Sequence, residues 1–312
     1  MSIAVLGAGV VGLSTALVAQ ERGHDVTIYT PVPTSQTTSA KAAASFVPHY
    51  VELGDVPAEV TKRAWARLSD FESEFGLTAG LRRRTHWEAA SVGQDRPFWL
   101  DVFPDASSVH FPDVPGGYAH AWRFSTLIAE TPLYLPWLVA RFLAAGGRIE
   151  LLSQAFASAQ DVLALPEPVI VNCTGLGSRA LFGDRLLRPA KGQIALVRPQ
   201  PQLDFTISHD GFYAYPRLDG CVLGGTLEVD VDTETVDPVA IHLILRAARR
   251  ILPDIGPDDV VRTYAGVRPY RERSIRIERE ALQDKVIVHH YGHGGAGITL
   301  SWGTAEYAVD LI

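Results

Sequence analysis

The N-terminus carries a glycine pattern that few folds can accommodate. An apolar run over residues 3–6 leads directly into Gly7-Ala-Gly-Val-Val-Gly12, and an apolar segment over 11–22 then ends at a glycine. Strand, glycine turn and helix in this order predict a βαβ unit whose second strand covers 25–29. The pattern therefore favours a dinucleotide-binding fold over an ordinary turn between a strand and a helix.

The glycines of this turn each have a steric reason. Gly7 permits the tight turn, Gly9 lets a pyrophosphate touch the backbone, and Gly12 lets the helix pack closely on the strand. An acidic residue normally ends the second strand and binds the ribose hydroxyls, but Thr30 and Pro31 stand there. Thr30 can donate a weaker hydrogen bond, so this strand does not choose between NAD and FAD.

A second glycine loop stands near the C-terminal end. A β-branched run over 286–288 predicts a strand, glycines follow at 292, 294, 295 and 297, and an apolar segment over 298–311 predicts a helix. In this geometry bare backbone can approach a ligand, and the helix N-terminus can face an anion or an electron-rich ring. Its meaning depends on the dinucleotide turn at the other end of the chain.

Composition excludes several classes of partner. The net charge is −7, whereas nucleic-acid binding needs a basic stripe. No apolar run approaches the roughly 18 residues of a membrane span, and the first residues open directly into a strand, without a signal peptide. Cys173 and Cys221 cannot form a disulfide framework and lack metal-ligand spacing. We therefore expect a soluble, cytoplasmic protein that binds neither nucleic acid nor membrane.

The rest of the chain predicts a discontinuous two-domain plan. The predicted helices cover 58–80, 133–143 and 240–251, the predicted strands cover 81–92, 148–152, 169–175, 193–197, 211–216, 221–225, 260–267 and 274–278, and 95–114 is predicted as loops. We expect an α/β fold with an α+β second domain. The Rossmann-like domain is expected over 1–50, 134–197 and 280–312, and a discontinuous antiparallel-sheet domain over 51–133 and 198–279.

Three side chains stand out as candidates for chemistry. Pro269 forces Arg268 toward an extended backbone, and a guanidinium is the preferred group for bidentate capture of a carboxylate. The alternative is an arginine in a surface ion pair. Tyr213 and Tyr215 lie two positions apart, hence on one face of a strand, where a phenol is most often part of the core.

The sequence shows no catalytic triad, paired acid motif, phosphate loop or metal cluster. His289, His290 and His293 lie close together, but neighbouring strand residues point to opposite faces, so we expect no metal. The hydroxyl-rich segment over 34–48 is either a flexible loop or a diphosphate-binding segment whose alanines leave room for a flat ring. Without an acid–base set in the protein, we expect a cofactor to carry the chemistry.

Taken in their order, these motifs resemble the FAD-dependent family of D-amino-acid oxidases and D-aspartate oxidases. The resemblance covers nearly the whole chain and rests on residues 7–15, 37–39 with 42–44, 171–175, 191–194, 213–216, 223–226, 266–269 and 291–295. It implies that the Rossmann-like domain binds FAD and that the substrate lies between this domain and the antiparallel sheet.

By this resemblance, several separate parts of the chain hold FAD. The first glycine turn and 37–39 would hold the diphosphate, 43–45 would run beside the flavin, and the second glycine loop would place amides and a helix N-terminus at the flavin ring. The implied cofactor-binding residues are Gly7, Ala8, Gly9, Val10, Val11, Gly12, Thr30, Thr37, Thr38, Ser39, Ala43, Ala44, Ser45, Ala155, Arg268, Gly294, Gly295, Gly297, Ile298 and Thr299.

The resemblance also implies the catalytic roles. Arg268 would clamp the substrate carboxylate, Tyr213 would add a phenolic hydrogen bond, and the Gly295 carbonyl would accept from the amine. The α-hydrogen would leave as hydride to flavin N5, and oxygen would reoxidise the flavin to give hydrogen peroxide. The imino acid would hydrolyse to a 2-oxo acid and ammonia. The implied substrate pocket includes His49, Tyr215 and Leu227.

Two residues point to different substrates. His49 falls where aspartate-oxidising members of the family also carry histidine, whereas Leu227 stands where an arginine would bind a second carboxylate. A carboxylate without a cationic partner is costly in a closed pocket, while a leucine wall gains about 0.8 kcal/mol for each buried methylene. We therefore expect neutral D-amino acids, with D-aspartate oxidation and a dinucleotide-binding sensor without oxidase activity as alternatives. The expected partners are a small D-amino acid and oxygen, and a homodimer is left open.

Overall fold

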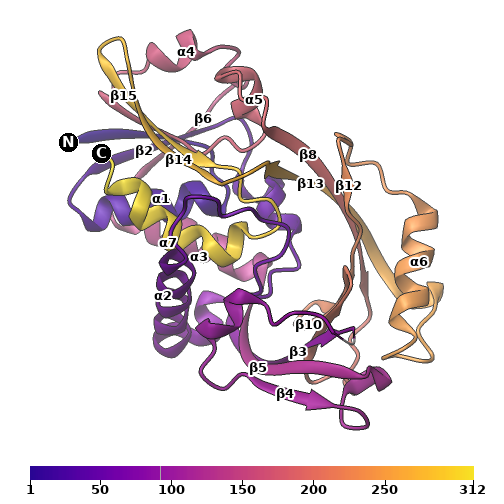
Figure 1. Cartoon of the computed structure of the whole chain (residues 1–312). Helices are drawn as coiled ribbons and strands as arrows, with labels where there is room; N and C mark the ends of the chain where they lie inside the picture. Colours follow the sequence, from indigo (N-terminus) through magenta and orange to yellow (C-terminus); the bar gives the residue numbers. More distant parts are fainter. Residues whose placement is uncertain (92) are drawn as a thin grey trace.

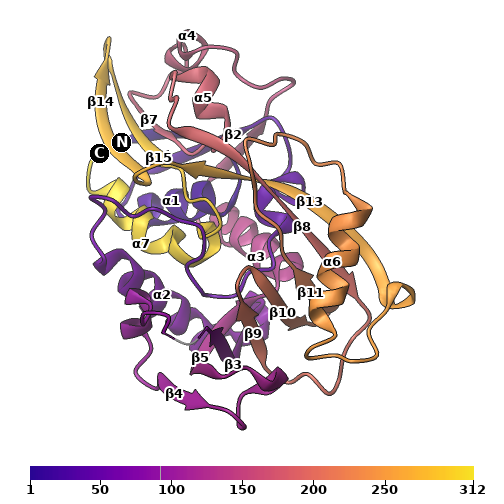
Figure 2. The ribbon, with the colours of Figure 1, turned by 45° about the vertical axis from the view of Figure 1, so that its right-hand side comes forward.

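The computed structural model describes residues 1–91 and 93–312. Two β-sheets organise the molecule, and the chain alternates between them along its length (Figures 1 and 2). Val92, the last residue of the strand predicted over 81–92, lies outside the described residues. The mixed α/β character agrees with the expected fold class.

The first sheet has six strands in the order β14-β15-β7-β1-β2-β6. The central strands pair in parallel, and β14 pairs antiparallel with β15 at one edge. β7 is buried along its whole length and β1 almost so, as parallel strands covered on both faces must be, and this explains their continuous apolar sequences. The strands are β1 (Ser2–Leu6), β2 (Asp25–Thr30), β6 (Arg148–Leu151), β7 (Val169–Asn172), β14 (Arg276–Leu282) and β15 (Lys285–Tyr291).

Helices cover both faces of this sheet. One face packs on a large apolar core shared with α1 (Val10–Glu21), α2 (Glu59–Phe75), α3 (Thr131–Ala144) and α7 (Gly297–Val309). α7 packs against both α1 and α2, and Trp302 Nε1 donates to Tyr134 Oη at 2.8 Å to tie α7 to α3. The opposite face packs on the short helices α4 (Ala159–Leu163) and α5 (Gly177–Leu181).

The second sheet has nine strands in the order β12-β8-β11-β10-β9-β3-β5-β4, with β13 also paired to β8. Helix α6 (Pro238–Ala248) packs its apolar side on one face of it, against β8, β10 and β11. The other face looks toward the first sheet and carries the side chains described below. The strands are β3 (Leu81–Ala90), β4 (Ser107–His110), β5 (His120–Ala129), β8 (Leu187–Val197), β9 (Thr206–His209), β10 (Phe212–Arg217), β11 (Gly220–Gly224), β12 (Glu228–Val229) and β13 (Val260–Arg271).

The structure moves two of the expected domain boundaries. β8 was expected with the Rossmann-like segment 134–197, but it pairs antiparallel with β13 from Leu187 to Val197 and so belongs to the second sheet. β14 begins at Arg276 and lies wholly in the first sheet, although 276–279 were expected in the second domain. The segment predicted as loops over 95–114 also contains a strand, β4.

Strand β13 connects the two halves of the molecule. Its end reaches the second glycine loop, where Tyr270 forms an antiparallel bridge with His293 and Gly294 N donates to Pro269 O at 2.9 Å. The strand that carries Arg268 is therefore held directly beside the loop that follows β15.

Candidate active site

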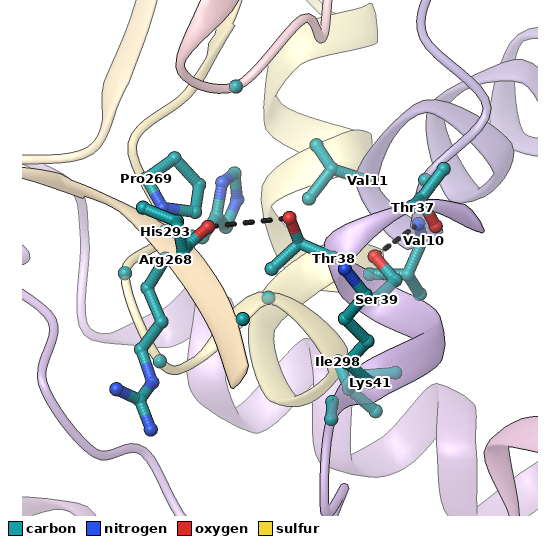
Figure 3. Close-up of a pocket in the computed structure, with 18 of the residues that line it drawn as sticks. Val10, Val11, Thr37, Thr38, Ser39, Lys41, Arg268, Pro269, His293 and Ile298 are labelled. Carbon is teal, nitrogen blue, oxygen red and sulfur yellow. Dashed lines mark hydrogen bonds between the residues drawn. The ribbon is translucent and has the colours of Figure 1, made fainter. Parts of the chain in front are cut away.

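A cavity of about 910 Å³ lies between the two sheets, and both glycine loops line it. It opens at the carboxyl ends of the parallel strands, which is the usual ligand position in such sheets. The segment 34–48 also lines it, and Thr38 Oγ1 donates to Val267 O at 3.3 Å, so this segment is fixed against β13 (Figure 3). The interpretation of 34–48 as a ligand-binding segment agrees with this position.

The N-terminus of α1 opens onto one end of the cavity. Val10 N donates to Ser39 Oγ at 3.0 Å, which brings the two segments together (Figure 3). The N-cap residue, Gly9, has no side chain, and the first turn of α1 holds no acid, so the dipole of the helix and its N-terminal amides other than that of Val10 are available to an anion. Gly12 does not line the cavity; a Cβ there would overlap the Gly7 carbonyl, so its role is packing.

The second glycine loop and the N-terminus of α7 form the middle of the cavity. Gly294 has φ of +52°, and a Cβ there would overlap the Tyr50 carbonyl. Gly295 N donates to that same carbonyl at 3.2 Å, and no hydrogen bond among the described residues uses the Gly295 carbonyl. Ala44 and Tyr50 also have positive φ and line the cavity, and strained backbone of this kind concentrates at functional sites.

Arg268 reaches into the cavity from β13. Its guanidinium lies over Gly192 of β8, where a Cβ would overlap it, and Nη1 donates to Thr226 O at 3.1 Å. The Tyr50 ring lies 5.7 Å from the guanidinium carbon. In the part of the chain that the structure describes, no carboxylate forms an ion pair with Arg268, so the prediction of a surface ion pair does not fit.

Tyr213 and Tyr215 share one face of β10, as their spacing predicted. Their rings stack with centroids 4.7 Å apart, and the Tyr213 ring lies over Gly224, where a Cβ would overlap it. Burial raises the pKa of Tyr213, although the nearby Arg268 guanidinium opposes this shift. Both phenols are therefore protonated at neutral pH and able to donate.

A polar group closes the far end of the cavity. Glu88 lines it, is nearly fully buried, and accepts from Ser208 Oγ at 2.6 Å. His86 Nε2 lies 3.2 Å from the same carboxylate oxygen, and His49 Nε2 lies 3.9 Å from it. Glu88 and Tyr50 were not identified from the sequence. The available signal for Glu88 was its spacing from His86, because two polar residues two positions apart lie on the same face of a strand.

The comparisons with known proteins agree with this geometry. The sequence model of the family described as FAD dependent oxidoreductase matches residues 2–311. The chain belongs to this family. It is 34% identical to a D-amino-acid oxidase of Streptomyces coelicolor, over 99% of this chain and 96% of that protein. It is also 34% identical to human D-aspartate oxidase, over 99% and 94%.

A solved structure shows the same fold. Glycine oxidase from Bacillus cereus superposes with a TM-score of 0.81 and 21% identity, over 99% of this chain and 94% of that chain. The protein is thus an FAD-dependent oxidoreductase, and the expected cofactor and fold class are confirmed. No helix among the described residues is long and apolar enough to cross a membrane.

The residues present fit FAD. All the cofactor-binding residues implied by the sequence line the cavity except Gly12. Ser45 Oγ and His290 Nε2 line it too, and both are buried polar atoms without a hydrogen-bond partner in the described chain. Buried polar atoms are normally paired, so these two atoms indicate a polar ligand. The N-termini of α1 and α7 also line the cavity, and the amides of a helix N-terminus are suited to an anionic group or an electron-rich ring.

Thr30 lies at the expected place but with a different capacity. Its Oγ1 donates to Val32 O at 2.8 Å, so the hydroxyl proton is already used. Thr30 can therefore only accept from a ribose hydroxyl, and the expectation of a donated hydrogen bond is wrong. Ala155 lines the same end of the cavity.

Leu227 does not belong to the pocket. It is absent from the cavity lining, and 41% of its surface is exposed. Thr226 turns inward instead, where its Oγ1 accepts from Gln193 N at 3.1 Å and its carbonyl accepts from Arg268. Neighbours in extended chain point to opposite sides, so Leu227 faces outward. The predicted leucine wall is therefore wrong, whereas His49 and Tyr215 do line the cavity.

The three histidines near the second glycine loop point in different directions. His289 Nε2 lies 2.9 Å from Glu280, whereas His290 Nδ1 lies 2.8 Å from Thr15 on the other side of the sheet. Burial lowers the pKa of His293 to about 3, so this ring is neutral. Among residues 1–91 and 93–312, no group of His, Cys, Asp or Glu is arranged to hold a metal ion.

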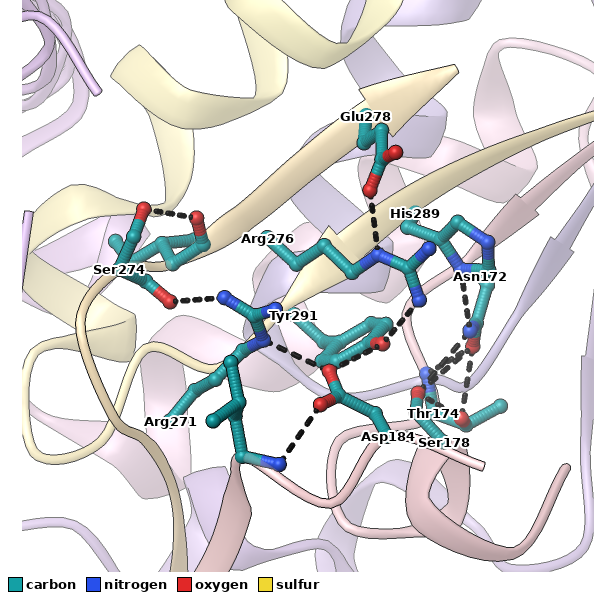
Figure 4. A network of polar contacts seen from close by, with 12 residues as sticks. Asn172, Thr174, Ser178, Asp184, Arg271, Ser274, Arg276, Glu278, His289 and Tyr291 are labelled. Carbon is teal, nitrogen blue, oxygen red and sulfur yellow. Dashed lines mark hydrogen bonds and ion pairs between the residues drawn. The ribbon is translucent and has the colours of Figure 1, made fainter. Parts of the chain in front are cut away.

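A network of polar side chains supports the site from behind (Figure 4). Asp184 accepts from Arg271 Nε at 2.7 Å and from Tyr291 Oη at 2.9 Å, and so joins the end of β13 to the end of β15. Arg276 Nη1 donates to Tyr291 Oη at 3.0 Å. The strand that carries Arg268 and the strand that precedes the glycine loop are thus held by one carboxylate.

Proposed function

We propose that the protein catalyses the oxidative deamination of D-amino acids. The substrate loses hydride from Cα, and the resulting imino acid hydrolyses to a 2-oxo acid and ammonia. FAD, when bound, accepts this hydride at N5 and passes the electrons to oxygen, with hydrogen peroxide as the product. The relatives named D-amino-acid oxidase and D-aspartate oxidase, each similar over nearly the whole chain, support this assignment.

The observation that carries the proposal is the position of Arg268. Its guanidinium lies in the cavity, without a carboxylate partner in the described chain, beside the loop expected to face the flavin ring. A guanidinium in this state is suited to bidentate binding of a substrate carboxylate. Tyr213 would donate a second hydrogen bond to that carboxylate, and the Gly295 carbonyl would accept from the amine.

No protein base is needed at Cα once the amine is neutral. Both cavity tyrosines hold their protons, because burial raises the pKa of Tyr213 and raises that of Tyr215 well above its ordinary value. The protein therefore binds and orients the substrate, excludes water, and leaves the redox step to the cofactor.

We further propose that neutral side chains are preferred to acidic ones. Of the described residues that line the cavity, Arg268 and Lys41 carry the permanent positive charges, and Lys41 pairs with Glu234. A second substrate carboxylate would thus enter the cavity without a cation of its own, at a desolvation cost. Glu88 replaces Leu227 as the residue that supports this preference.

The test is anaerobic reduction of the purified yellow protein. Loss of the flavin absorbance on addition of D-alanine, without loss on addition of L-alanine, is expected, and air should restore the colour with release of one peroxide per turnover. A protein that stays oxidised with every D-amino acid, neutral, basic or acidic, would exclude the proposed reaction. A higher kcat/KM for D-aspartate than for D-valine would overturn the substrate preference alone.

A further inference from the structure

The far end of the cavity holds a carboxylate that the proposed reaction does not use. Glu88 Oε2 accepts from Ser208 and lies against His86, but none of the hydrogen bonds among the described residues uses Oε1. The side chain lines the cavity although it is nearly fully buried. His49 Nε2 is likewise buried and without a hydrogen-bond partner in the described chain. Both residues line the cavity.

Strand register places Glu88 across the cavity from Arg268. Ser208 is paired with Glu88 on one side and with Tyr213 on the other, so all three side chains lie on one face of the sheet. Four strand spacings separate β3, which carries Glu88, from β8, over which Arg268 lies. At about 4.8 Å each, this is roughly 19 Å from the guanidinium over β8 to the backbone of β3, and the Glu88 side chain shortens the gap from the β3 side.

A continuous row of side chains covers the same distance. The Tyr50 ring lies 5.7 Å from Arg268, the His49 ring lies 6.2 Å from Tyr50, and His49 Nε2 lies 3.9 Å from Glu88. A substrate whose carboxylate is bound by Arg268 has room to extend its side chain along this row. The end of that side chain would then meet the Glu88 carboxylate.

This end of the cavity is anionic. Burial raises the pKa of Glu88, but the hydrogen bonds to His86 and Ser208 oppose burial, and the pKa lies below its ordinary value. Asp210 adds a second acid at the cavity wall. Burial lowers the pKa of His49 despite the nearby Glu88, so this ring is neutral at pH 7.

We propose that Glu88 determines side-chain specificity and selects D-amino acids that end in an ammonium or guanidinium group. This inference rests on the proposed function and extends its range from neutral to basic side chains. The free enzyme has already desolvated the carboxylate, so a cation gains an ion pair there at a reduced cost. A side-chain carboxylate meets a like charge in a medium of low dielectric constant and is disfavoured.

The experiment compares side chains of matched length in the FAD-loaded enzyme. D-lysine and D-norleucine differ by the terminal ammonium, and D-glutamate and D-glutamine differ by the charge of the terminal group. We expect kcat/KM for D-lysine to exceed that for D-norleucine by roughly tenfold or more, because a hydrogen bond to a charged group is worth at least that factor in binding. In Glu88→Gln this ratio should fall toward one, and the ratio of D-glutamate to D-glutamine should rise.

Glu130→Gln is the matched control. Glu130 is equally buried and pairs with Arg82, but it lies outside the cavity lining, so the lysine to norleucine ratio should stay as in the wild type. If Glu88→Gln does not retain FAD, the wild-type enzyme alone tests the inference. Equal kcat/KM values for D-norleucine and D-lysine would overturn it. Reduction of the flavin by D-alanine with a ratio of one leaves the proposed function intact, whereas no reduction by any D-amino acid removes both.

Discussion

The guanidinium of Arg268 occupies the space over Gly192 that a side chain would fill. The two residues lie on neighbouring strands, β13 and β8, which pair along the full length of β8. The Arg268 guanidinium can take this position only because residue 192 has no side chain. The group that moves if a Cβ is added is the flexible end of the arginine, not the sheet.

Gly192→Ala should therefore impair substrate binding without unfolding the protein. Displacing the guanidinium is expected to raise KM for D-alanine by roughly tenfold or more, as loss of a hydrogen bond between charged groups does. FAD content, measured by the ratio of absorbance at the flavin band to that of the protein, should stay normal. Gly256→Ala is the control, because a Cβ there meets open space. An unchanged KM would mean that Arg268 does not bind the carboxylate.

Arg268→Ala should have a larger effect. Removing one partner of a buried charge pair costs about 3–5 kcal/mol, so kcat/KM should fall by roughly 10² to 10³ or more. FAD content should again be normal. Arg198→Ala is the control. Arg198 directly follows β8, is exposed and lies near Asp259, so this variant should keep the wild-type kcat/KM and FAD content. Near-full activity of Arg268→Ala on D-alanine would place the carboxylate anchor elsewhere.

Tyr213→Phe should have a small effect, because the phenol binds and moves no proton. One hydrogen bond contributes about 0.5–1.5 kcal/mol, so kcat/KM should fall by roughly two- to tenfold. Stopped-flow measurement of flavin reduction separates binding from chemistry. A much slower reduction at saturating substrate, with unchanged substrate affinity, would show that the phenol takes part in the reaction itself.

Gly294→Ala should lose cofactor rather than substrate. The residue has φ of +52°, and a Cβ would overlap the Tyr50 carbonyl, which is backbone and cannot turn away. The loop must shift, and we expect FAD content to fall at least severalfold when the protein is purified without added FAD. Gly256→Ala is again the control, since a Cβ there meets open space and the residue lies outside the cavity lining. Full flavin content in Gly294→Ala would contradict this account of the loop.

Asp184→Asn tests the network that joins β13 to β15. Burial raises the pKa of Asp184, but hydrogen bonds from Arg271 and Tyr291 outweigh it and hold the pKa below its ordinary value. A depressed pKa stabilises the fold above the unfolded pKa of about 3.9, and this contribution is lost as pH falls through the folded value. At pH 7 the variant should unfold at a lower urea concentration than the wild type. Its free energy of unfolding should be lower by about 1.5–3 kcal/mol. The difference from the wild type should shrink below about pH 4, and a difference that grew on acidification would contradict the mechanism.

The parts of the site that were predicted from the sequence are those with local causes. Gly7, Gly294 and Arg268 each stand in a short pattern whose geometry depends on the adjacent residues, and all three lie where expected. Glu88 could not be found this way, because its meaning depends on Ser208, which lies 120 residues further along the chain. The side chain of Leu227 depends on which way the chain turns after Thr226, and motif position alone does not determine that direction.

The domain boundaries show the same limit. Residues 187–197 are buried almost throughout and could be assigned to either sheet by their sequence, and β8 belongs to the second because it pairs with β11, β12 and β13, which all come later in the chain. Long-range pairing partners decide sheet membership, and no local pattern records them.

The alternation of the chain between the two sheets has a consequence for biosynthesis. β15 pairs with β7 in the interior of the first sheet, and α7 packs on α1, so segments that are far apart in the sequence must meet before the cavity exists. Chains emerge at roughly 5–20 residues per second, and the N-terminal βαβ unit therefore waits tens of seconds or less with its apolar faces uncovered. We therefore expect flavin uptake to follow the synthesis of α7, and the N-terminal βαβ unit to need protection by chaperones until then.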